Sequence, residues 1–359
     1  MPQDHPAIAR AEAFAATLGI RMPILQAPTA GACPSSLAIA IANAGGLGAC
    51  GALLMQPEAI RNWVSEVRAA SEGGFQMNLW IPDPGPKRDA AAEAAVRAFL
   101  GRWGPEVAAD AGDKRPPDFA TQCEALLAVR PAVISSIMGI YPPEFVERMR
   151  AQGIKWFATV TTVAEAKIAA GAGADAIVAQ GAEAGGHRGA FDATKAEAET
   201  VGLFALVPAV CDAVEIPVIA TGGIADARGV AAALLLGASA VEIGSGFLRS
   251  PEARLPKAWA DAMALSQPEQ TMLTRAFSGR AGRSVATAYV RAAAAFDAPR
   301  PAPYPVQRGL TQAMRQLGVK NSDIDRSQAW AGQSARLAEA IPAGAIARKL
   351  WEGAQALLR

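Results

Sequence analysis

The residue best suited to acid–base chemistry in this chain is His187, in the glycine-rich segment QGAEAGGHRG at positions 180–189. An imidazole ionises with a pKa of about 6.5, so it can remove a proton or hydrogen-bond an anion near neutral pH. The chain has 2 histidines, and His5 falls in an N-terminal segment that we expect to be loose. A histidine-dependent step would therefore use His187, which we expect to be catalytic. The alternative is a loop histidine with a structural role.

Two charged residues accompany this histidine in the same segment. Arg188 is either an anion-binding group or an exposed loop arginine. Glu183 is expected to be a solvated loop carboxylate. Neither is assigned a catalytic role.

Two glycine-containing turns, ATGGI at 220–224 and EIGSGF at 242–247, each follow an apolar run that predicts a strand. Glycine lets the backbone approach a ligand closely, and exposed backbone N–H groups bind phosphate. In (β/α)8 barrels, the loops after the seventh and eighth strands often form a phosphate site. The turns therefore predict such a site, while glycines that only form tight turns are the alternative. The residues concerned are Gly222, Gly223, Gly244 and the hydroxyl-bearing Ser245.

Three further segments fall at predicted strand ends. QAPTAG at 26–31 offers a proline and small residues against which a flat ring can lie. Asn78, in QMNLW at 76–80, and Gln180 each carry an amide with donor and acceptor groups. Such amides suit the uracil-like edge of a flavin ring. A buried amide that only ties down a loop is the alternative for each.

The elements that must position these groups alternate from residue 23 to about residue 250, where short apolar runs are separated by alanine-rich amphipathic stretches. This alternation is typical of repeated βα units, and eight strands fit closure into a barrel. An open doubly wound sheet shares the alternation, but its fingerprint GxGxxG is missing after the first strand. We therefore predict an α/β fold, a TIM (β/α)8 barrel with an additional α-helical domain. The predicted strands are 24–27, 47–50, 76–79, 133–136, 156–160, 176–179, 218–220 and 240–243.

Three stretches lie outside this alternation. Residues 82–131 are too long for a simple connection and contain a predicted helix at 89–103. Residues 251–325 read as helices and proline-rich loops, and an amphipathic helix at 341–358 is placed to return to the barrel wall. The predicted division is a barrel over 1–250, a helical cap over 251–325 and a C-terminal segment, 326–359, that returns to the barrel.

Composition limits the classes of partner. Hydrophobic residues make up 51% of the 359 residues and charged residues 19%, which is typical of a globular protein. The formal net charge is +1, so no strong field attracts nucleic acid or a membrane surface, and a small ligand is expected. No apolar run reaches the ~18 residues of a spanning helix, and the N-terminus lacks the apolar core of a signal peptide. The 4 scattered cysteines favour free thiols, no metal site and a cytoplasmic location.

The order and spacing of several segments resemble those of the nitronate monooxygenases, formerly called 2-nitropropane dioxygenases. The segments are QAPTAG, NAGGLGA at 43–49, MNLW, AQGAEAGGHRG, ATGGI, LGASAVEIGSGF and FSGRAGR at 277–283. AWAGQSA at 329–335 also resembles the first class of that family. The resemblance covers most of the chain and implies an FMN-binding TIM barrel with a helical second domain. It also implies oxidation of alkyl nitronates, such as propionate 3-nitronate, by O2 to carbonyl compounds and nitrite.

Carried over residue by residue, the resemblance makes His187 the catalytic histidine near the flavin. Two residues depart from the family pattern: Thr29 stands where methionine is more common, and Glu242 where an amide is common. Thr29 would leave a smaller, more polar surface near the flavin, and the contact of Glu242 itself is in doubt. Gln333 is a weaker candidate for contact. The FMN contacts implied are Thr29, Asn78, Gln180, Gly185, Gly186, Gly222, Gly223, Glu242, Ile243, Gly244 and Ser245.

Two other functions stay open. One is an NAD(P)H-dependent FMN reductase of the same barrel type that acts on a quinone or an enoyl thioester. The other is a barrel that binds a phosphate-bearing ligand without catalysis. The spacing of the motifs leaves open whether His187 acts as a base or as a hydrogen-bond donor. It also leaves the oligomeric state open, with a homodimer as one alternative.

Overall fold

The core of the molecule is a ring of short strands whose residues are almost all buried. The computed structural model describes residues 5–359; the first four, in the segment where no signal peptide is expected, lie outside this range. All eight predicted strands are confirmed, with each end within one residue of the prediction. They are β1 (Ile24–Gln26), β2 (Gly48–Gly51), β3 (Phe75–Trp80), β4 (Val133–Ile137), β5 (Lys155–Val160), β6 (Ala176–Gln180), β8 (Val218–Thr221) and β9 (Ala240–Ile243).

These strands form one parallel sheet in the order β1-β9-β8-β6-β5-β4-β3-β2. Its two outer members meet, because Leu25 of β1 bridges Leu47, the residue before β2. The backbone N–H of Gln26 donates to the carbonyl of Leu47 at 2.9 Å. The sheet therefore closes into a TIM barrel, and the open doubly wound alternative is excluded.

Helices cover the outer face of the barrel and bury one apolar side each. Helix starts are marked by proline, as at Pro57 and Pro143, or by a capping side chain, as where Asp226 accepts from the N–H of Gly229 at 3.0 Å. The helices that follow barrel strands are α2 (Ser35–Ala44), α3 (Pro57–Ala70), α5 (Phe119–Val129), α6 (Pro143–Ala151), α7 (Val163–Gly171), α8 (Leu203–Cys211) and α9 (Ala227–Leu235).

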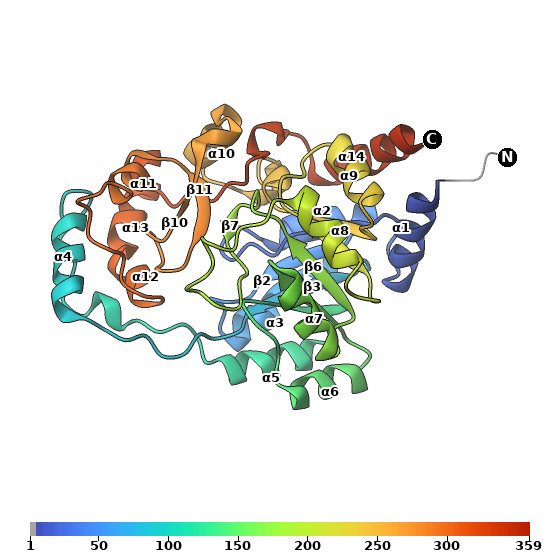
Figure 1. Ribbon diagram of the computed structural model, residues 1–359, viewed down its shortest axis with the longest axis horizontal. Helices are drawn as coiled ribbons and strands as arrows, with labels where there is room; N and C mark the ends of the chain where they lie inside the picture. Colours follow the sequence, from blue (N-terminus) through green and yellow to red (C-terminus); the bar gives the residue numbers. More distant parts are fainter. Residues whose placement is uncertain (1–4) are drawn as a thin grey trace.

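The two ends of the described chain add a helix each to the barrel (Figure 1). α14 (Ala343–Leu358) packs against α2 and α9, two helices on the outer face of the barrel. α1 (Pro6–Thr17) starts directly after His5, whose Nδ1 accepts from the N–H of Ala7 at 3.2 Å. The expectation of a loose segment around His5 is therefore wrong, because this histidine caps a helix.

A second body lies beside the barrel mouth, at the end of the molecule opposite α1 (Figure 1). It contains a three-stranded antiparallel sheet in the order β10-β11-β7, which the prediction of helices and loops alone missed. The sheet is built from segments far apart in the sequence, since β7 belongs to the loop after β6. The elements are α4 (Ala90–Leu100), β7 (Gly186–His187), α10 (Lys257–Leu265), β10 (Thr271–Thr274), β11 (Gly282–Val285), α11 (Ala288–Ala293), α12 (Val306–Leu310) and α13 (Gln312–Lys320).

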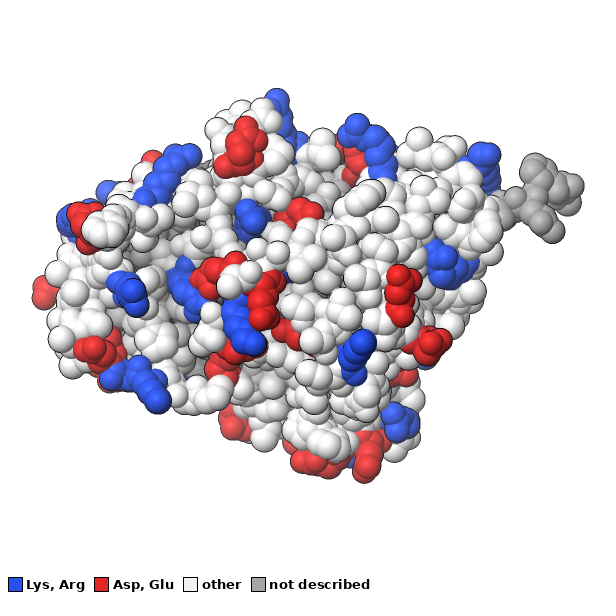
Figure 2. Space-filling model, in the orientation of Figure 1, with Lys and Arg blue, Asp and Glu red and all other residues white. Residues whose placement is uncertain are grey.

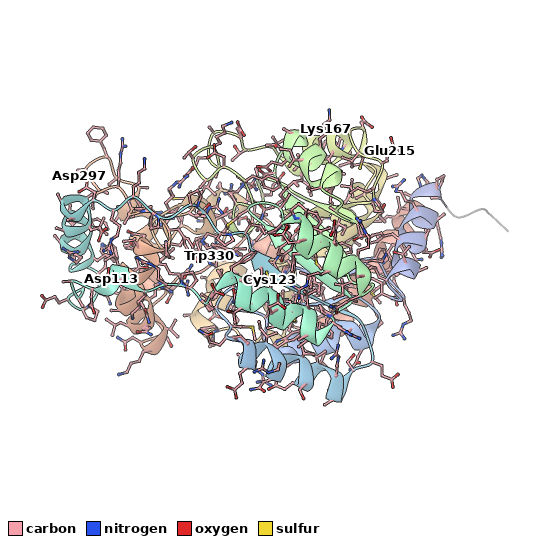
Figure 3. All side chains as sticks on the ribbon, turned by 90° about the horizontal axis from the view of Figure 1, so that it is seen from below. Asp113, Cys123, Lys167, Glu215, Asp297 and Trp330 are labelled. Atoms are coloured by element: carbon pink, nitrogen blue, oxygen red, sulfur yellow. The ribbon has the colours of Figure 1, made fainter. Side chains whose placement is uncertain are left out.

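This body has its own hydrophobic cluster, in which Leu100 of α4 packs with Phe277, Tyr289, Leu310 and Trp330. α4, which belongs to the long segment after β3, thus packs with elements that come after the barrel strands in the sequence. Trp330 lies near the middle of the molecule, whereas Asp113 and Asp297 lie at the outer end (Figure 3).

The surface carries its charges in mixed form. On the face shown in Figure 2, basic and acidic side chains are interspersed, in agreement with the net charge of +1. Of the helices within residues 5–359, none combines the length and apolar character needed to span a bilayer.

Candidate functional site

A cavity of about 480 Å³ lies where the carboxyl ends of the barrel strands meet the second body. Its size is within the range of about 300 to 1,000 Å³ typical of small-molecule sites. The barrel supplies the ends of β1, β3, β6, β8 and β9, and the second body supplies Tyr304, Arg308 and Trp330. The position matches that of active sites in TIM barrels.

Most of the predicted site residues meet at this cavity. Ile243 does not, because it is buried in the barrel core with 1% of its surface exposed. Gln333 does not line it either, although its backbone N–H donates to the carbonyl of Glu183 at 2.9 Å. The lining residues among those predicted are Thr29, Asn78, Gln180, Gly185, Gly186, His187, Gly222, Gly223, Glu242, Gly244 and Ser245.

The two glycine turns present unused donors at one part of the cavity wall. Within the described chain, no group accepts a hydrogen bond from the backbone N–H of Gly222, Gly223, Gly244 or Ser245. Gly222 and Gly223 have φ of 110° and 70°, a conformation that favours glycine. The hydroxyl of Ser245 accepts from the N–H of Gly332 at 2.9 Å, so its own proton is free to donate. These donors fit a phosphate group, which needs several N–H and O–H partners at once.

The two predicted amide side chains differ in how much of their bonding capacity is left. Gln180 uses its amide to hold the loop, because Nε2 donates to the carbonyl of His187 at 3.0 Å and Oε1 accepts from the N–H of Gly189 at 2.8 Å. Asn78 donates through Nδ2 to Ser135 Oγ at 3.1 Å, and its Oδ1 has no partner in the described part of the chain. Asn78 is therefore the more available of the two for a ligand.

His187 is held between two indole rings on the cavity wall. The ring of Trp80 lies 4.6 Å from the imidazole centroid and that of Trp330 lies 4.7 Å away, both edge-on. Nε2 is 2.7 Å from Ser278 Oγ, which fixes the position of the ring. Burial lowers the pKa of His187 to about 3, and the charges of Arg280 and Arg308 add to this effect. The imidazole is therefore neutral at physiological pH.

Both charged neighbours in the same loop bond to the backbone, which contradicts the exposed-arginine alternative for Arg188 and the solvated carboxylate expected for Glu183. Arg188 is buried, with 2% of its surface exposed, and donates to the carbonyl of Gly181 at 2.6 Å. Glu183 accepts from the N–H of Leu203, at the start of α8, at 2.9 and 3.0 Å. The loop folds back onto the barrel, so neither side chain is free in solvent.

The prediction missed the groups that the second body contributes. Arg308 lines the cavity, and neither an ion pair nor a side-chain hydrogen bond forms on it within residues 5–359. Burial lowers the pKa of its guanidinium. The hydroxyl of Tyr304 is also buried without a hydrogen-bond partner in the described structure. Three residues that contact His187 fall within motifs noted in the sequence: Trp80 in MNLW, Ser278 in FSGRAGR and Trp330 in AWAGQSA. The motifs gave no sign that these residues surround one histidine.

Arg315 completes a basic end of the cavity. Its guanidinium donates to Gln328 Oε1 at 3.1 Å, to the carbonyl of Arg308 at 2.9 Å and to Thr311 Oγ1 at 3.2 Å. All three acceptors are neutral. Two positive side chains therefore share one end of the cavity without a carboxylate to balance them.

Comparison with known proteins places the chain within a family. A profile described as nitronate monooxygenase matches residues 11–353. A nitronate monooxygenase of Pseudomonas aeruginosa is 37% identical over 94% of this chain and 98% of its own length. A nitronate monooxygenase of Paraburkholderia phytofirmans is 35% identical over 93% of this chain and 92% of its own.

Solved structures agree with these relatives. The structure of a nitroalkane oxidase from Streptomyces ansochromogenes has a TM-score of 0.85 at 32% identity, covering 96% of this chain and 99% of that one. FabK from Thermotoga maritima has a TM-score of 0.75 at 28% identity, covering 96% of both chains. Because the family profile spans nearly the whole chain and the relatives match it from end to end, the chain belongs to the nitronate monooxygenase family.

Proposed function

We propose that this protein is an FMN-dependent nitronate monooxygenase that oxidises alkyl nitronates with O2 to a carbonyl compound and nitrite. The observation that carries the proposal is a neutral histidine held between two tryptophans on a cavity that also presents four unused backbone donors. In a member of this family, these two features supply a place for the reacting group and a place for a phosphate.

The residues present fit FMN. The free N–H groups of Gly222, Gly223, Gly244 and Ser245 would hold the phosphate. A side chain at Gly244 would meet only the Cβ of Ala27, at 3.5 Å, so the cavity is open there. The free amide oxygen of Asn78 would bind a polar edge of the flavin ring. Bound FMN would supply the electron transfer between the nitronate and O2.

His187 would act on the substrate as a hydrogen-bond donor. A residue whose pKa is lowered to about 3 is a weak base, which disfavours removal of a proton from a neutral nitroalkane. A neutral imidazole N–H can instead bind the negative oxygens of a nitronate. Trp80 and Trp330 pack edge-on against the imidazole and would hold it in place for this bond.

The basic end of the cavity favours a substrate with a second negative group. Arg308 and Arg315 line the cavity and lack carboxylate partners within residues 5–359. A guanidinium pairs well with a carboxylate through two parallel hydrogen bonds. A nitronate that carries a carboxylate, such as propionate 3-nitronate, would meet His187 with one end and Arg308 with the other.

The purified protein tests the proposal directly. We expect a yellow protein with the visible spectrum of a bound flavin, FMN released on denaturation, and nitrite formed when propionate 3-nitronate is added in air. No nitrite would overturn the monooxygenase. Rapid bleaching of the flavin by NADH without oxygen would favour the reductase instead, and a colourless protein that binds phosphate ligands would favour the non-catalytic barrel.

The redox state of the four cysteines indicates the cellular compartment of the enzyme. All four are free thiols in the structure. Free thiols persist in reducing compartments, so we propose a cytoplasmic location. Fractionation of the source cells followed by detection of the protein checks it.

A further inference from the structure

Glu242 is a carboxyl group at the end of β9, on the wall of the cavity. It is 5% exposed, and since it lines the cavity, its exposed part faces that space. One oxygen, Oε1, accepts from Gln76 Nε2 at 2.7 Å. The other oxygen, Oε2, has no hydrogen-bond partner among residues 5–359.

The contacts of Gln76 determine which oxygen of Glu242 can carry a proton. Gln76 Nε2 also donates to the backbone carbonyl of Gln26 at 2.9 Å. A carbonyl oxygen only accepts, so the atom between these two groups must be the amide nitrogen and both its protons are used. Oε1 of Glu242 is therefore an acceptor in either charge state, and a proton on the carboxyl must sit on Oε2.

The surroundings of Glu242 contain no cation to stabilise its charged form. The titratable groups from neighbouring strands and their loops are the thiols of Cys33 and Cys50, and burial raises the pKa of both. β3 and β8 carry none. His187, elsewhere on the cavity wall, is neutral because its pKa is lowered to about 3.

The helices packed outside β9 do not change this picture. α1 carries Arg10, which is bonded to backbone carbonyls of residues 234 and 238, and α9 carries Arg228, which pairs with Asp226. No charged group contributes to the pKa of Glu242, which burial raises to about 7 against the opposing effect of the bond from Gln76. The carboxyl is thus balanced between its two charge states in the physiological range.

We propose that Glu242 binds the cofactor in its neutral form, donating a hydrogen bond from Oε2 to an acceptor atom of the flavin, and that its ionisation releases the cofactor. The inference rests on the proposed function, because it concerns FMN in the same cavity. A neutral carboxyl offers one donor and one acceptor, the same pair as the amide that the family resemblance implied for this position.

Ionisation removes that donor and places a negative charge against a ring edge that carries carbonyl oxygens. Because only the neutral form binds well, the dissociation constant of FMN rises with pH above the pKa of Glu242, approaching about tenfold per pH unit. Below that pKa the affinity is independent of this residue. The direction is therefore weaker FMN binding in more alkaline solution.

The test compares FMN release from the wild-type holoprotein and from Glu242→Gln. The amide of the variant keeps an acceptor for Gln76 and a donor toward the cavity but cannot ionise. Each holoprotein is diluted at about pH 6 and about pH 9, and released FMN is measured by its fluorescence. FMN phosphate and His187 are the same in both proteins, so their titration cancels in the comparison.

We expect the wild type and Glu242→Gln to hold FMN about equally at the lower pH. At the higher pH the wild-type dissociation constant should exceed that of the variant by at least about tenfold. Equal pH dependence in the two proteins would overturn the inference while leaving the proposed function intact. A holoprotein that contains no FMN at either pH would overturn the proposed function, and this inference with it.

A third variant, Glu242→Leu, separates the hydrogen bond from the charge. Its side chain has neither a hydrogen-bond donor nor a charge. We therefore expect weaker FMN binding than in Glu242→Gln at both pH values, with the same dependence on pH as in Glu242→Gln. Affinity equal to that of Glu242→Gln would show that Oε2 makes no bond to the cofactor and would overturn the inference.

Discussion

His187 owes its properties to the three side chains around it. The two indole rings pack edge-on against the imidazole, and Ser278 positions the ring through Nε2. A histidine in this setting is suited to binding an anion and poorly suited to taking a proton. The lowered pKa therefore favours the hydrogen-bond donor of the two roles left open by the sequence.

Replacement of His187 by asparagine tests this role. We expect nitronate oxidation to fall by about a hundredfold or more, since loss of one positioned hydrogen-bond donor to a reacting anion costs about 10² to 10³ in rate. FMN content should stay unchanged, because the phosphate donors lie on other loops. The measurement is nitrite production at saturating and limiting nitronate. His5→Asn is the matched control, since asparagine also caps a helix. Full activity in His187→Asn with FMN bound would rule out the catalytic assignment.

Arg308 is the residue that should distinguish substrates. In Arg308→Leu we expect kcat/KM for propionate 3-nitronate to fall by about tenfold to a hundredfold relative to ethyl nitronate, which lacks the carboxylate. The magnitude follows from the ~1.5 to 3 kcal/mol of a charged hydrogen bond. Arg300→Leu, at an exposed position of the same region, serves as control. An equal loss for both substrates would contradict the assigned role.

At the scale of elements, the helix that completes the barrel wall is α14. Its inner face buries Leu350 at 3% exposure, while Leu357 is 58% exposed on the same helix. We expect Leu350→Ala to lower the free energy of unfolding by about 2 to 5 kcal/mol and Leu357→Ala by less than about 0.5 kcal/mol. Urea unfolding followed by circular dichroism measures both. Similar losses in the two variants would mean that α14 is not held by its inner face.

The elements also show which parts of the structure the sequence can predict. The barrel strands were predicted within one residue because each is a buried apolar run bounded by turn residues, a local signal. β10 and β11 were missed because both are short and mixed in polarity, and because β11 pairs with β7, nearly a hundred residues away. The glycine turns were found from local sequence, whereas the partners of His187 come from three separate segments.

At the scale of the whole molecule, the cavity joins two bodies that supply different chemistry. The barrel loops carry the free backbone donors and Glu242, while the second body carries Tyr304, Arg308 and Trp330. The proposed function therefore assigns cofactor binding and substrate selection to different bodies, each with its own hydrophobic cluster. The proposed division at residue 250 stays a prediction, and α4 in the second cluster argues for including that helix with the cap.

This division predicts that a destabilising substitution in the second hydrophobic cluster weakens substrate binding and leaves cofactor binding unchanged. Leu100, on α4, is fully buried in a cluster that also contains Phe277, which precedes Ser278, and Leu310, two residues after Arg308. We expect Leu100→Ala to cost about 2 to 5 kcal/mol of stability and to raise KM for the nitronate, with FMN retained. Leu265→Ala, 77% exposed on α10, is the control. Because Leu100 does not line the cavity, a rise in KM without loss of FMN would arise through the packing of the second body. Loss of FMN at unchanged KM would mean that the two bodies do not divide the work in this way.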